Sequence, residues 1–266
     1  MTSQSTPGTA LITGASTGIG AAYADRLARR GYDLILVARN QERLSALAAS
    51  IAAKTGRKIR FLVADLKKRS DLRDIEKVLA TDASITLLVN NAGVGAVAPL
   101  VSTNVDDMEA LIDLNVTALT RLTYAAAPAF AARGAGGIIQ IASAVGISPE
   151  TLNGVYGASK AFVIALTQSL QHELAGKGLR LQVVLPGAIS TPFWDVAGMP
   201  VSDLPTDFVM TTDDLVDAAL AGFDMGEVYT IPSLPDVAQF DAYEAARVAM
   251  VPYLSKTKPA ARYGVR

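Results

Sequence analysis

Short apolar runs alternate with segments of helical periodicity along most of this chain. Seven runs rich in Ile, Leu and Val are typical of β-strands, the last being the weakest: 9–13, 33–38, 58–65, 85–90, 137–143, 179–187 and 227–232. Helical patterns lie between them, at 19–31, 42–56, 71–80, about 105–132 and about 155–175. Nearly continuous apolar strands indicate a sheet that is buried on both faces. The alternation predicts an α/β fold with a doubly wound parallel sheet in three layers.

The chain has 266 residues, of which half are apolar and 18% are charged, and these values suit one globular domain. Because neither a repeat nor a low-complexity linker interrupts the pattern, we expect a single Rossmann-like domain over 1–266. Within it we expect a flexible N-terminus at 1–8, a substrate loop or lid at 193–226 and a C-terminal extension at 233–266. The extension has a helical first half and a basic end. It is either a solvated tail or a segment that packs over a neighbouring subunit or the substrate cleft.

Charge and residue usage exclude several classes of protein. The net charge of -1, from 24 basic and 25 acidic residues, lacks the basic excess of nucleic-acid-binding proteins. Cysteine is absent and His172 is the only histidine, so we expect no disulfide, no thiolate nucleophile and no metal. The polar start has no secretory signal, and no apolar run reads as a membrane helix. We therefore expect a soluble cytoplasmic protein without a membrane partner.

The stretch "TGASTGIG" at 13–20 lies between the first strand and the first helix. Its glycines permit a tight turn and close approach of a ligand, and the helix N-terminus offers N–H groups to a pyrophosphate. A plain βα loop is the alternative. The residues that we expect at a dinucleotide in this turn are Gly14, Ser16, Thr17, Gly18, Ile19 and Gly20.

Arg39 follows the second strand at the position where an NAD site carries an acidic residue for the ribose 2′-hydroxyl. A guanidinium there can pair instead with a 2′-phosphate. Arg39 thus favours NADP(H), in practice NADPH, over NAD. The alternative is a solvated loop arginine.

The stretch "YGASK" at 156–160 puts Tyr156 and Lys160 one helical turn apart, on the same face. An ammonium beside a phenol favours the phenolate, so the tyrosine pKa should fall from its usual ~10. Such a tyrosine could act as a general acid or base near neutral pH. A surface pair without chemistry is the alternative.

Several further motifs follow in a fixed order: "NNAG" at 90–93, "LNV" at 114–116, "IAS" ending at Ser143, and "PGAISTP" at 186–192. Together with "TGASTGIG" and "YGASK", this set resembles the short-chain dehydrogenases/reductases over about 9–232. The resemblance implies an oxidoreductase that transfers a hydride between a nicotinamide and a carbonyl or secondary alcohol.

The resemblance also implies roles for four catalytic residues. Tyr156 would protonate the carbonyl oxygen in reduction and act as the base in oxidation. Lys160 would bind the nicotinamide ribose and lower the pKa of Tyr156. Ser143 would hold the substrate oxygen, and Asn115 would stabilise a helix irregularity and a water molecule that links Lys160 to solvent.

Further dinucleotide contacts are implied by the same resemblance. Two residues would lie at the adenine, three near its ribose, and four at the nicotinamide end: Asp65 and Leu66; Asn91, Ala92 and Gly93; Pro186, Gly187, Ile189 and Thr191. Structural roles, such as support of the central sheet or a cap on a strand end, are the alternatives.

The substrate should lie above the nicotinamide, and the residues that we expect around it are Ser143, Val145, Asn153, Phe193 and Trp194. The stretch 193–210 is apolar, so we expect apolar ketones, aldehydes or secondary alcohols as substrates. These side chains could instead pack on the body of the protein.

The sequence thus favours an NADP(H)-dependent carbonyl or alcohol oxidoreductase. Within that class an NAD-dependent alcohol or hydroxysteroid-type dehydrogenase and a 3-oxoacyl-type reductase stay open. A non-enzymatic dinucleotide sensor would not need the intact catalytic set, and a methyltransferase would leave "YGASK" and Arg39 unexplained. A homodimer or homotetramer, formed through the helices around 105–132 and 155–175, is implied by the resemblance.

Overall fold

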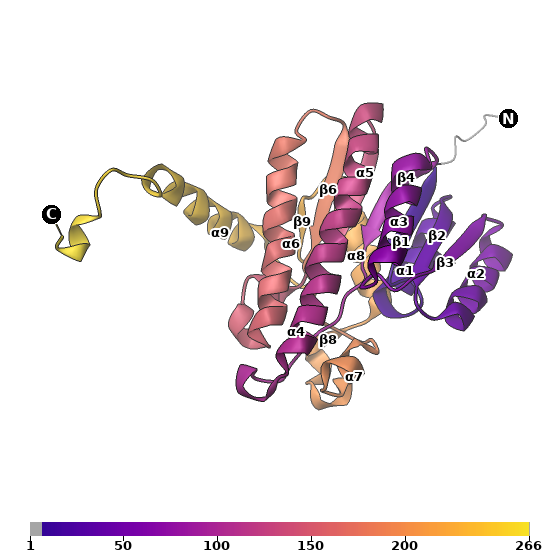
Figure 1. Cartoon of the computed structure of the whole chain (residues 1–266), viewed down its shortest axis with the longest axis horizontal. Helices are drawn as coiled ribbons and strands as arrows, with labels where there is room; N and C mark the ends of the chain where they lie inside the picture. Colours follow the sequence, from indigo (N-terminus) through magenta and orange to yellow (C-terminus); the bar gives the residue numbers. More distant parts are fainter. Residues whose placement is uncertain (1–6, 266) are drawn as a thin grey trace. The chain divides into compact units, whose positions relative to one another are not determined.

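The computed structural model describes residues 7–265 (Figure 1). Contacts divide the chain into a first unit that ends at Pro232 and a second unit that begins at Ser233. Most of the expected flexible N-terminus, residues 1–6, lies outside the described residues, as does Arg266 at the basic end of the expected extension.

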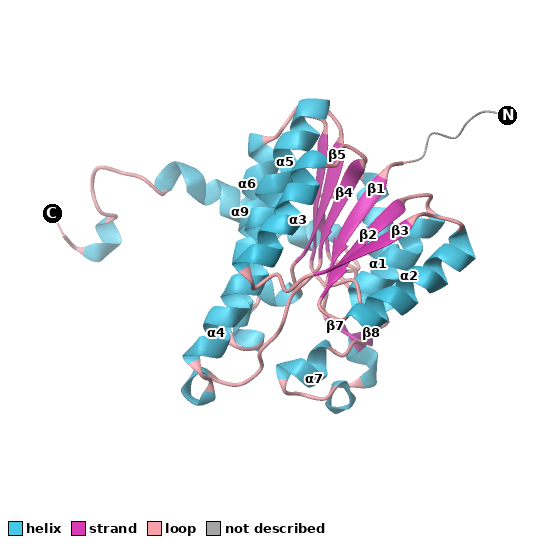
Figure 2. Ribbon diagram, turned by 45° about the vertical axis from the view of Figure 1, so that its right-hand side comes forward, coloured by secondary structure: helices cyan, strands magenta, loops and turns pink. Residues whose placement is uncertain are grey.

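A seven-stranded parallel sheet forms the centre of the first unit (Figure 2). Its order is β3-β2-β1-β4-β5-β6-β9. The strands are β1 (Thr9–Thr13), β2 (Asp33–Ala38), β3 (Ile59–Val63), β4 (Ile85–Asn90), β5 (Gly136–Ile141), β6 (Leu179–Val184) and β9 (Tyr229–Thr230). The predicted doubly wound α/β fold is therefore confirmed.

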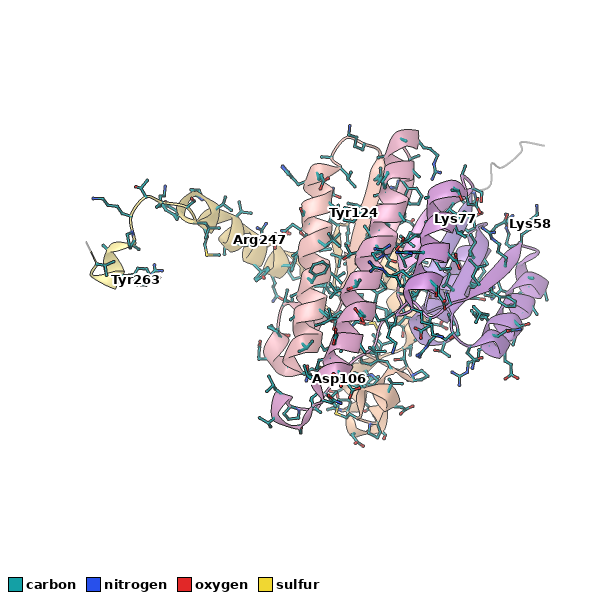
Figure 3. All side chains as sticks on the ribbon, in the orientation of Figure 1. Lys58, Lys77, Asp106, Tyr124, Arg247 and Tyr263 are labelled. Atoms are coloured by element: carbon teal, nitrogen blue, oxygen red, sulfur yellow. The ribbon has the colours of Figure 1, made fainter. Side chains whose placement is uncertain are left out.

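Helices cover both faces of this sheet. They are α1 (Gly18–Arg29), α2 (Gln41–Thr55), α3 (Arg69–Thr81), α4 (Val105–Ile112), α5 (Leu119–Arg133), α6 (Gly154–Glu173), α7 (Phe193–Ala197) and α8 (Thr212–Met225). On one face α1, α2 and α8 bury side chains such as Leu27, Leu44 and Leu215. On the other face α3 and α5 do the same with Ile75 and Phe130. Side chains on the outer surface, such as Tyr124 of α5, are exposed (Figure 3).

The long helix expected over about 105–132 is interrupted in its middle. A π-helix, Asp113–Ala118, separates α4 from α5 and contains Asn115. Such insertions often mark functional sites because they redirect side chains locally.

The segment expected as a lid, 193–226, consists of two different parts. Its second half is α8, which buries Leu215 and Leu220 against α1 and is held there by an Arg26–Asp217 ion pair at 2.7 Å. This half belongs to the body of the unit, because burial on that scale opposes opening. The first half lies between β7 (Ala188–Ile189) and β8 (Val209–Met210), which pair in parallel and fix both of its ends.

The second unit contains α9 (Val237–Met250), which is N-capped by the Asp236 side chain. Phe240 is its buried residue, while Tyr243 and Met250 are exposed. Within residues 7–265, none of the helices has the length and apolar character needed to cross a membrane.

Candidate active site

The sequence motifs meet at the carboxyl edge of the parallel sheet. The glycine turn follows β1, the "NNAG" loop follows β4, Ser143 follows β5 and Pro186 follows β6. Parallel strands bring all four loops to one edge, and the strand order reverses at β1 and β4. Ligands of doubly wound folds bind at such a reversal.

The glycine turn packs closely on neighbouring loops, and the positive φ angles of Gly14 and Gly18 disfavour other residues there. Gly14 has φ 64°, and a Cβ there would lie 2.9 Å from the Cα of Ala92. Gly18 has φ 55°, and its Cβ would lie 3.1 Å from the Thr191 Cγ2 atom. Thr17 is the N-cap of α1, but its side chain accepts no hydrogen bond from the first turn. The turn therefore offers backbone N–H groups beside Thr191, on the opposite loop.

Thr13 ties the glycine turn to the loop after β4, and the sequence reasoning missed this role. Its hydroxyl accepts hydrogen bonds from the backbone N–H groups of Asn91 and Ala92, both at 3.0 Å. The Asn91 amide donates in return to the carbonyls of Thr13 at 2.9 Å and Gly14 at 3.2 Å. The sequence did contain a signal for this role: Thr13 is a hydroxyl residue at the end of β1, and the "NNAG" motif follows the neighbouring strand β4.

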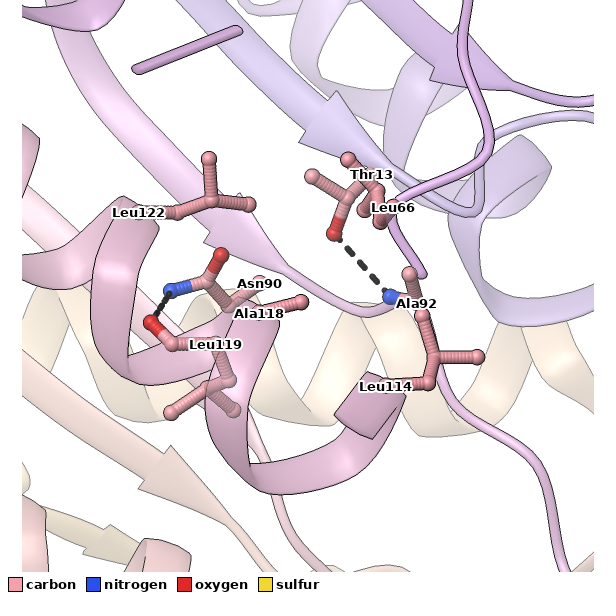
Figure 4. Close-up of a pocket in the computed structure, with 8 residues that line it drawn as sticks. All are labelled: Thr13, Leu66, Asn90, Ala92, Leu114, Ala118, Leu119 and Leu122. Atoms are coloured by element: carbon pink, nitrogen blue, oxygen red, sulfur yellow. Dashed lines mark hydrogen bonds between the residues drawn. The ribbon is translucent and has the colours of Figure 1, made fainter. Parts of the chain in front are cut away.

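A narrow gap lies behind this contact, between β1, β4 and α5 (Figure 4). Asn90 lines it and donates from its amide to Thr123 and Gln140, both at 3.0 Å, while its own carbonyl oxygen is buried without a partner. The gap has no room for a water molecule. It is therefore part of the support of the central sheet rather than a ligand pocket.

Arg39 is exposed immediately after β2. Val37, two residues earlier, pairs with Thr13 of β1 and accepts a hydrogen bond from Ala15 at 3.2 Å. The register thus places Arg39 beside the glycine turn.

Tyr156 lies in the first turn of α6 and is 5% exposed. Asn153 caps this helix by accepting hydrogen bonds from the backbone N–H groups of Val155 and Tyr156. The Ser143 hydroxyl interacts with the phenol and also donates to the Pro186 carbonyl at 3.3 Å. The fold therefore brings Ser143 and Tyr156 together, although they come from different layers.

Lys160 is buried one turn further along α6, and its amine donates to the Ile141 carbonyl at 2.9 Å. The amine lies 5.8 Å from the centre of the Tyr156 ring. Burial lowers the pKa of Lys160 to about 8. Burial also raises the pKa of Tyr156 to about 12, against a smaller lowering effect of the Ser143 hydrogen bond. The expected fall of the tyrosine pKa is not met in this structure, because desolvation of the phenol is the larger effect.

Asn115 connects the π-helix to the loop after β4. Its amide donates to the Val94 carbonyl at 2.8 Å, and its carbonyl accepts from the Val94 N–H at 3.0 Å. The same amide donates to the Ser159 hydroxyl at 3.2 Å, and that hydroxyl donates to the Tyr156 carbonyl at 2.7 Å. Ser159, which the sequence reasoning did not single out, thus links Asn115 to the helical turn that carries Tyr156.

Tyr156 belongs to a cluster of apolar side chains. The cluster contains Leu111, Val145, Tyr156, Val94, Ala96, Met108, Leu152, Val155 and Phe193. The ring centres of Phe193 and Tyr156 are 5.8 Å apart, and Trp194 packs edge-on against Phe193 at 5.5 Å.

Two of the expected substrate residues, Val145 and Phe193, are therefore next to Tyr156. Trp194 and Asn153 make hydrogen bonds to neighbouring loops, and their contact with a substrate stays a prediction. The Trp194 indole is buried and donates to the Ile189 carbonyl at 2.8 Å, and the Asn153 amide donates to Ala98 at 2.6 Å. Both side chains hold the loops that carry the site.

The remaining expected dinucleotide contacts stay predictions. Asp65 accepts a hydrogen bond from the Lys67 N–H at 3.1 Å, Leu66 is buried, and the Ile189 side chain lies in the core. Gly93 is held beside Asn115 and Lys160, where a Cβ would lie 3.2 Å from the Asn115 Oδ1 atom. Gly187 is exposed beyond β6.

Comparison with known proteins identifies the family of this arrangement. A profile of the short chain dehydrogenase family matches residues 8–198. An uncharacterized oxidoreductase of Staphylococcus epidermidis is 36% identical over 184 residues, which are 69% of this chain and 78% of that protein. Human 17-beta-hydroxysteroid dehydrogenase type 3 is 38% identical over 184 residues, which are 68% of this chain and 59% of that protein.

Solved structures match over nearly the whole chain. A short-chain dehydrogenase from Sphingobium yanoikuyae in complex with NADPH is 48% identical with a TM-score of 0.93, over 96% of this chain and 100% of that one. A bulky-bulky ketone specific alcohol dehydrogenase from Comamonas testosteroni is 42% identical with a TM-score of 0.89, over 97% of this chain and 99% of that one.

Proposed function

Because the chain belongs to the short-chain dehydrogenase/reductase family, an oxidoreductase family that binds nicotinamide dinucleotides, we propose that it is an NADP(H)-dependent reductase of apolar ketones or aldehydes. The reverse reaction oxidises the corresponding secondary alcohol. One observation carries the proposal: the phenol of Tyr156 lies close enough to the Ser143 hydroxyl to interact with it, and Tyr156 belongs to an apolar cluster beside the carboxyl edge of the sheet. The sheet edge suits a dinucleotide, the two hydroxyls suit a carbonyl oxygen, and the cluster suits an apolar substituent.

The residues around the glycine turn fit a dinucleotide. A side chain at Gly14 would clash with Ala92, a side chain at Gly18 would crowd Thr191, and the first turn of α1 has no capping side chain. Its N–H groups would hold the pyrophosphate, and Arg39 would pair with the 2′-phosphate. When bound, the nicotinamide supplies the hydride to the carbonyl carbon or takes it from the alcohol carbon.

Tyr156 is suited to donate the proton that reduction needs. A phenol with a pKa of about 12 is neutral at pH 7 and still holds its proton. Ser143 would donate a hydrogen bond to the substrate oxygen and stabilise the charge that develops there. Lys160, whose pKa is about 8, is mostly protonated at neutral pH and would favour the phenolate that remains after proton transfer. Asn115 would hold the loop at Gly93 beside this amine.

Two observations support the finer choices of cofactor and substrate. Arg39 stands beside the glycine turn without an acidic residue at that position, and the similar Sphingobium structure contains NADPH. The cluster around Tyr156 is apolar, and the similar Comamonas enzyme is specific for ketones with two bulky substituents. We also retain as proposals a cytoplasmic location, a homodimer or homotetramer, and a role of 233–266 as an extension of one enzyme domain.

The cofactor is tested by titrating the protein with NADPH and NADH separately. We expect NADPH to bind at least tenfold more tightly, a difference of about 1.4 kcal/mol. Arg39→Ala should remove most of this difference, whereas Arg73→Ala, which removes an exposed arginine from α3, should preserve it. Equal binding of the two dinucleotides by the wild-type protein would contradict the NADP(H) assignment.

The reaction is tested by following NADPH consumption with a series of aliphatic and aryl ketones. We expect turnover with apolar ketones and none with sugars. Tyr156→Phe should abolish turnover while NADPH affinity stays close to the wild-type value, because the change removes the proton donor and little else. If that variant kept most of its activity, Tyr156 would not be the acid.

A further inference from the structure

Phe193 lies over the reactive tyrosine, and the geometry around it limits the space for a substrate. We propose that Phe193 and Gly95 together form a size gate: the ring of Phe193, seated on Gly95, occupies the space that a bulky or aromatic substituent of a ketone must enter. This inference rests on the proposed function and names the residues that decide which ketones reach Tyr156.

Gly95 provides the seat for the ring. A Cβ at this position would overlap the Cζ atom at the tip of the Phe193 ring and would lie 2.7 Å from Cε2 and 2.9 Å from Cε1. Gly95 does not have a positive φ, so its backbone conformation is open to other residues. The missing side chain is therefore needed for space, and the space that it leaves is filled by Phe193.

The ring of Phe193 packs against the apolar cluster that contains Tyr156. Phe193 and Tyr156 have ring centres 5.8 Å apart, and Tyr156 is 5% exposed. A carbonyl must approach the Tyr156 hydroxyl to about 2.6–3.2 Å before the proton is transferred. A ketone with small substituents has little need of the volume that the ring fills, whereas a ketone with a large substituent must displace the ring.

The surroundings of Phe193 allow its ring to move while its backbone stays in place. Phe193 is half-buried, but its neighbour Trp194 is 7% exposed and its indole is hydrogen-bonded to Ile189. The paired strands β7 and β8 hold the two ends of the segment. The space is thus most simply opened by rotation of the Phe193 side chain away from Gly95. Trp194, which packs against the Phe193 ring, stays in place during this rotation.

The gate is tested with Phe193→Ala, Gly95→Ala and the double variant. For each, kcat/KM is measured with NADPH for 2-butanone and for phenyl propyl ketone. Phe193→Ala should raise the ratio of phenyl propyl ketone to 2-butanone at least fivefold. Gly95→Ala should also raise the ratio, because its methyl group occupies the seat and holds the ring outward. The double variant should not exceed Phe193→Ala, since the methyl group then has no ring to displace.

Two matched controls separate the gate from a general loss of packing. Phe208 lies in the same segment as Phe193 and is 65% exposed, so Phe208→Ala removes a ring that packs little. Gly154→Ala adds a methyl group at a position where no other atom lies within 4 Å of it. Neither should change the ratio of the two ketones by more than twofold. Phe193→Leu, which keeps an apolar side chain with a shorter reach, should give an intermediate ratio if the alanine variant folds poorly.

Tryptophan fluorescence gives a readout that does not depend on activity. Trp194 is the only tryptophan in the chain and packs edge-on against Phe193. Its emission should shift to longer wavelength in both Phe193→Ala and Gly95→Ala, because both changes let water reach the indole. The two control variants should leave the emission unchanged.

The outcomes distinguish the gate from the function on which it rests. Wild-type turnover with an unchanged ratio in Phe193→Ala would overturn the gate and leave the proposed function intact. Unchanged emission and ratio in Gly95→Ala would overturn the role of Gly95 as the seat. A wild-type protein that binds NADPH but reduces neither ketone would refute the proposed function, and the gate with it.

Discussion

Lys160 is a buried cation whose only hydrogen bond among the described residues is to a backbone carbonyl, that of Ile141. Its pKa is about 8 in the folded protein and ~10.4 in an unfolded chain. Between these pH values the unfolded state binds more protons, so the free energy of unfolding rises with pH. Below about pH 8 the amine is charged in both states and its burial opposes folding.

We therefore predict a pH-dependent difference in stability between the wild-type protein and Lys160→Met. From pH 7 to pH 10 the wild-type protein should gain roughly 2 kcal/mol relative to the variant, because only the wild-type protein carries this group. Urea unfolding of both proteins at several pH values measures the difference, in which the other titrating groups cancel. A constant difference across this range would mean that the folded pKa of Lys160 is not lowered.

At the residue scale, the order of motifs predicts Tyr156, Ser143 and Asn115 as site residues, and the fold places the first two near each other. The direction of the tyrosine pKa was not accessible from sequence. Helical spacing gives the distance between Tyr156 and Lys160, but burial and the Ile141 carbonyl, which belongs to another layer, decide the electrostatics. Thr13 and Gly95 were missed for the same reason, since their roles depend on loops that are distant in sequence.

At the scale of elements, a hydrogen bond between two side chains, Asn115 and Ser159, links the π-helix to α6. Ser159 accepts a hydrogen bond from Asn115 and donates one to the Tyr156 carbonyl, so it holds the first turn of α6 against the π-helix. Loss of this link should shift the phenol by a fraction of an ångström. Small displacements of a reacting group lower turnover far more than they lower stability.

We predict that Ser159→Ala lowers kcat about tenfold, with a change of only about 1 kcal/mol in the free energy of unfolding. Thr167→Val is the matched control, because the Thr167 hydroxyl makes a comparable bond to the Val163 carbonyl on the same helix without a link to Asn115. The control should lose similar stability and keep its kcat. Steady-state kinetics and urea unfolding measure both effects, and equal kcat values for the two variants would exclude a positioning role of Ser159.

The strands were easier to predict than the elements after β6. Apolar runs marked β1, β2 and β4 with the bounds that the structure has, because these strands are buried on both faces. Helix α8 was assigned to a lid, although Thr211 caps its start and Gly226 follows its end. Its buried apolar residues, from Leu215 to Leu220, belong to the same core cluster as those of α1, and this packing places α8 in the body. The two-residue strands β7 and β8 have no periodicity that a sequence could reveal.

At the scale of the whole molecule, the two units differ in how much they bury. The first unit contains the sheet, both of its helical layers and every residue of the candidate active site. In the second unit, α9 buries Phe240, and the described residues that follow it are exposed. A segment with so little buried apolar surface contributes little to a folded core of its own.

We predict that a chain ending at Pro232 keeps the fold and the dinucleotide site of the full-length protein. Its NADPH dissociation constant should stay within about threefold of the full-length value, which is less than the ~1.4 kcal/mol of a tenfold change. Thermal unfolding, NADPH titration and molecular mass in solution should be measured on both proteins, with Phe240→Ala in the full chain as a control that keeps the length. If the shortened protein were unfolded, or bound NADPH tenfold more weakly, the second unit would be part of the enzyme's core. The mass in solution divided by the chain mass gives the number of subunits. Fewer subunits in the shortened protein, with unchanged NADPH affinity, would instead indicate that the exposed apolar residues of α9, such as Tyr243 and Met250, are covered by another copy of the chain.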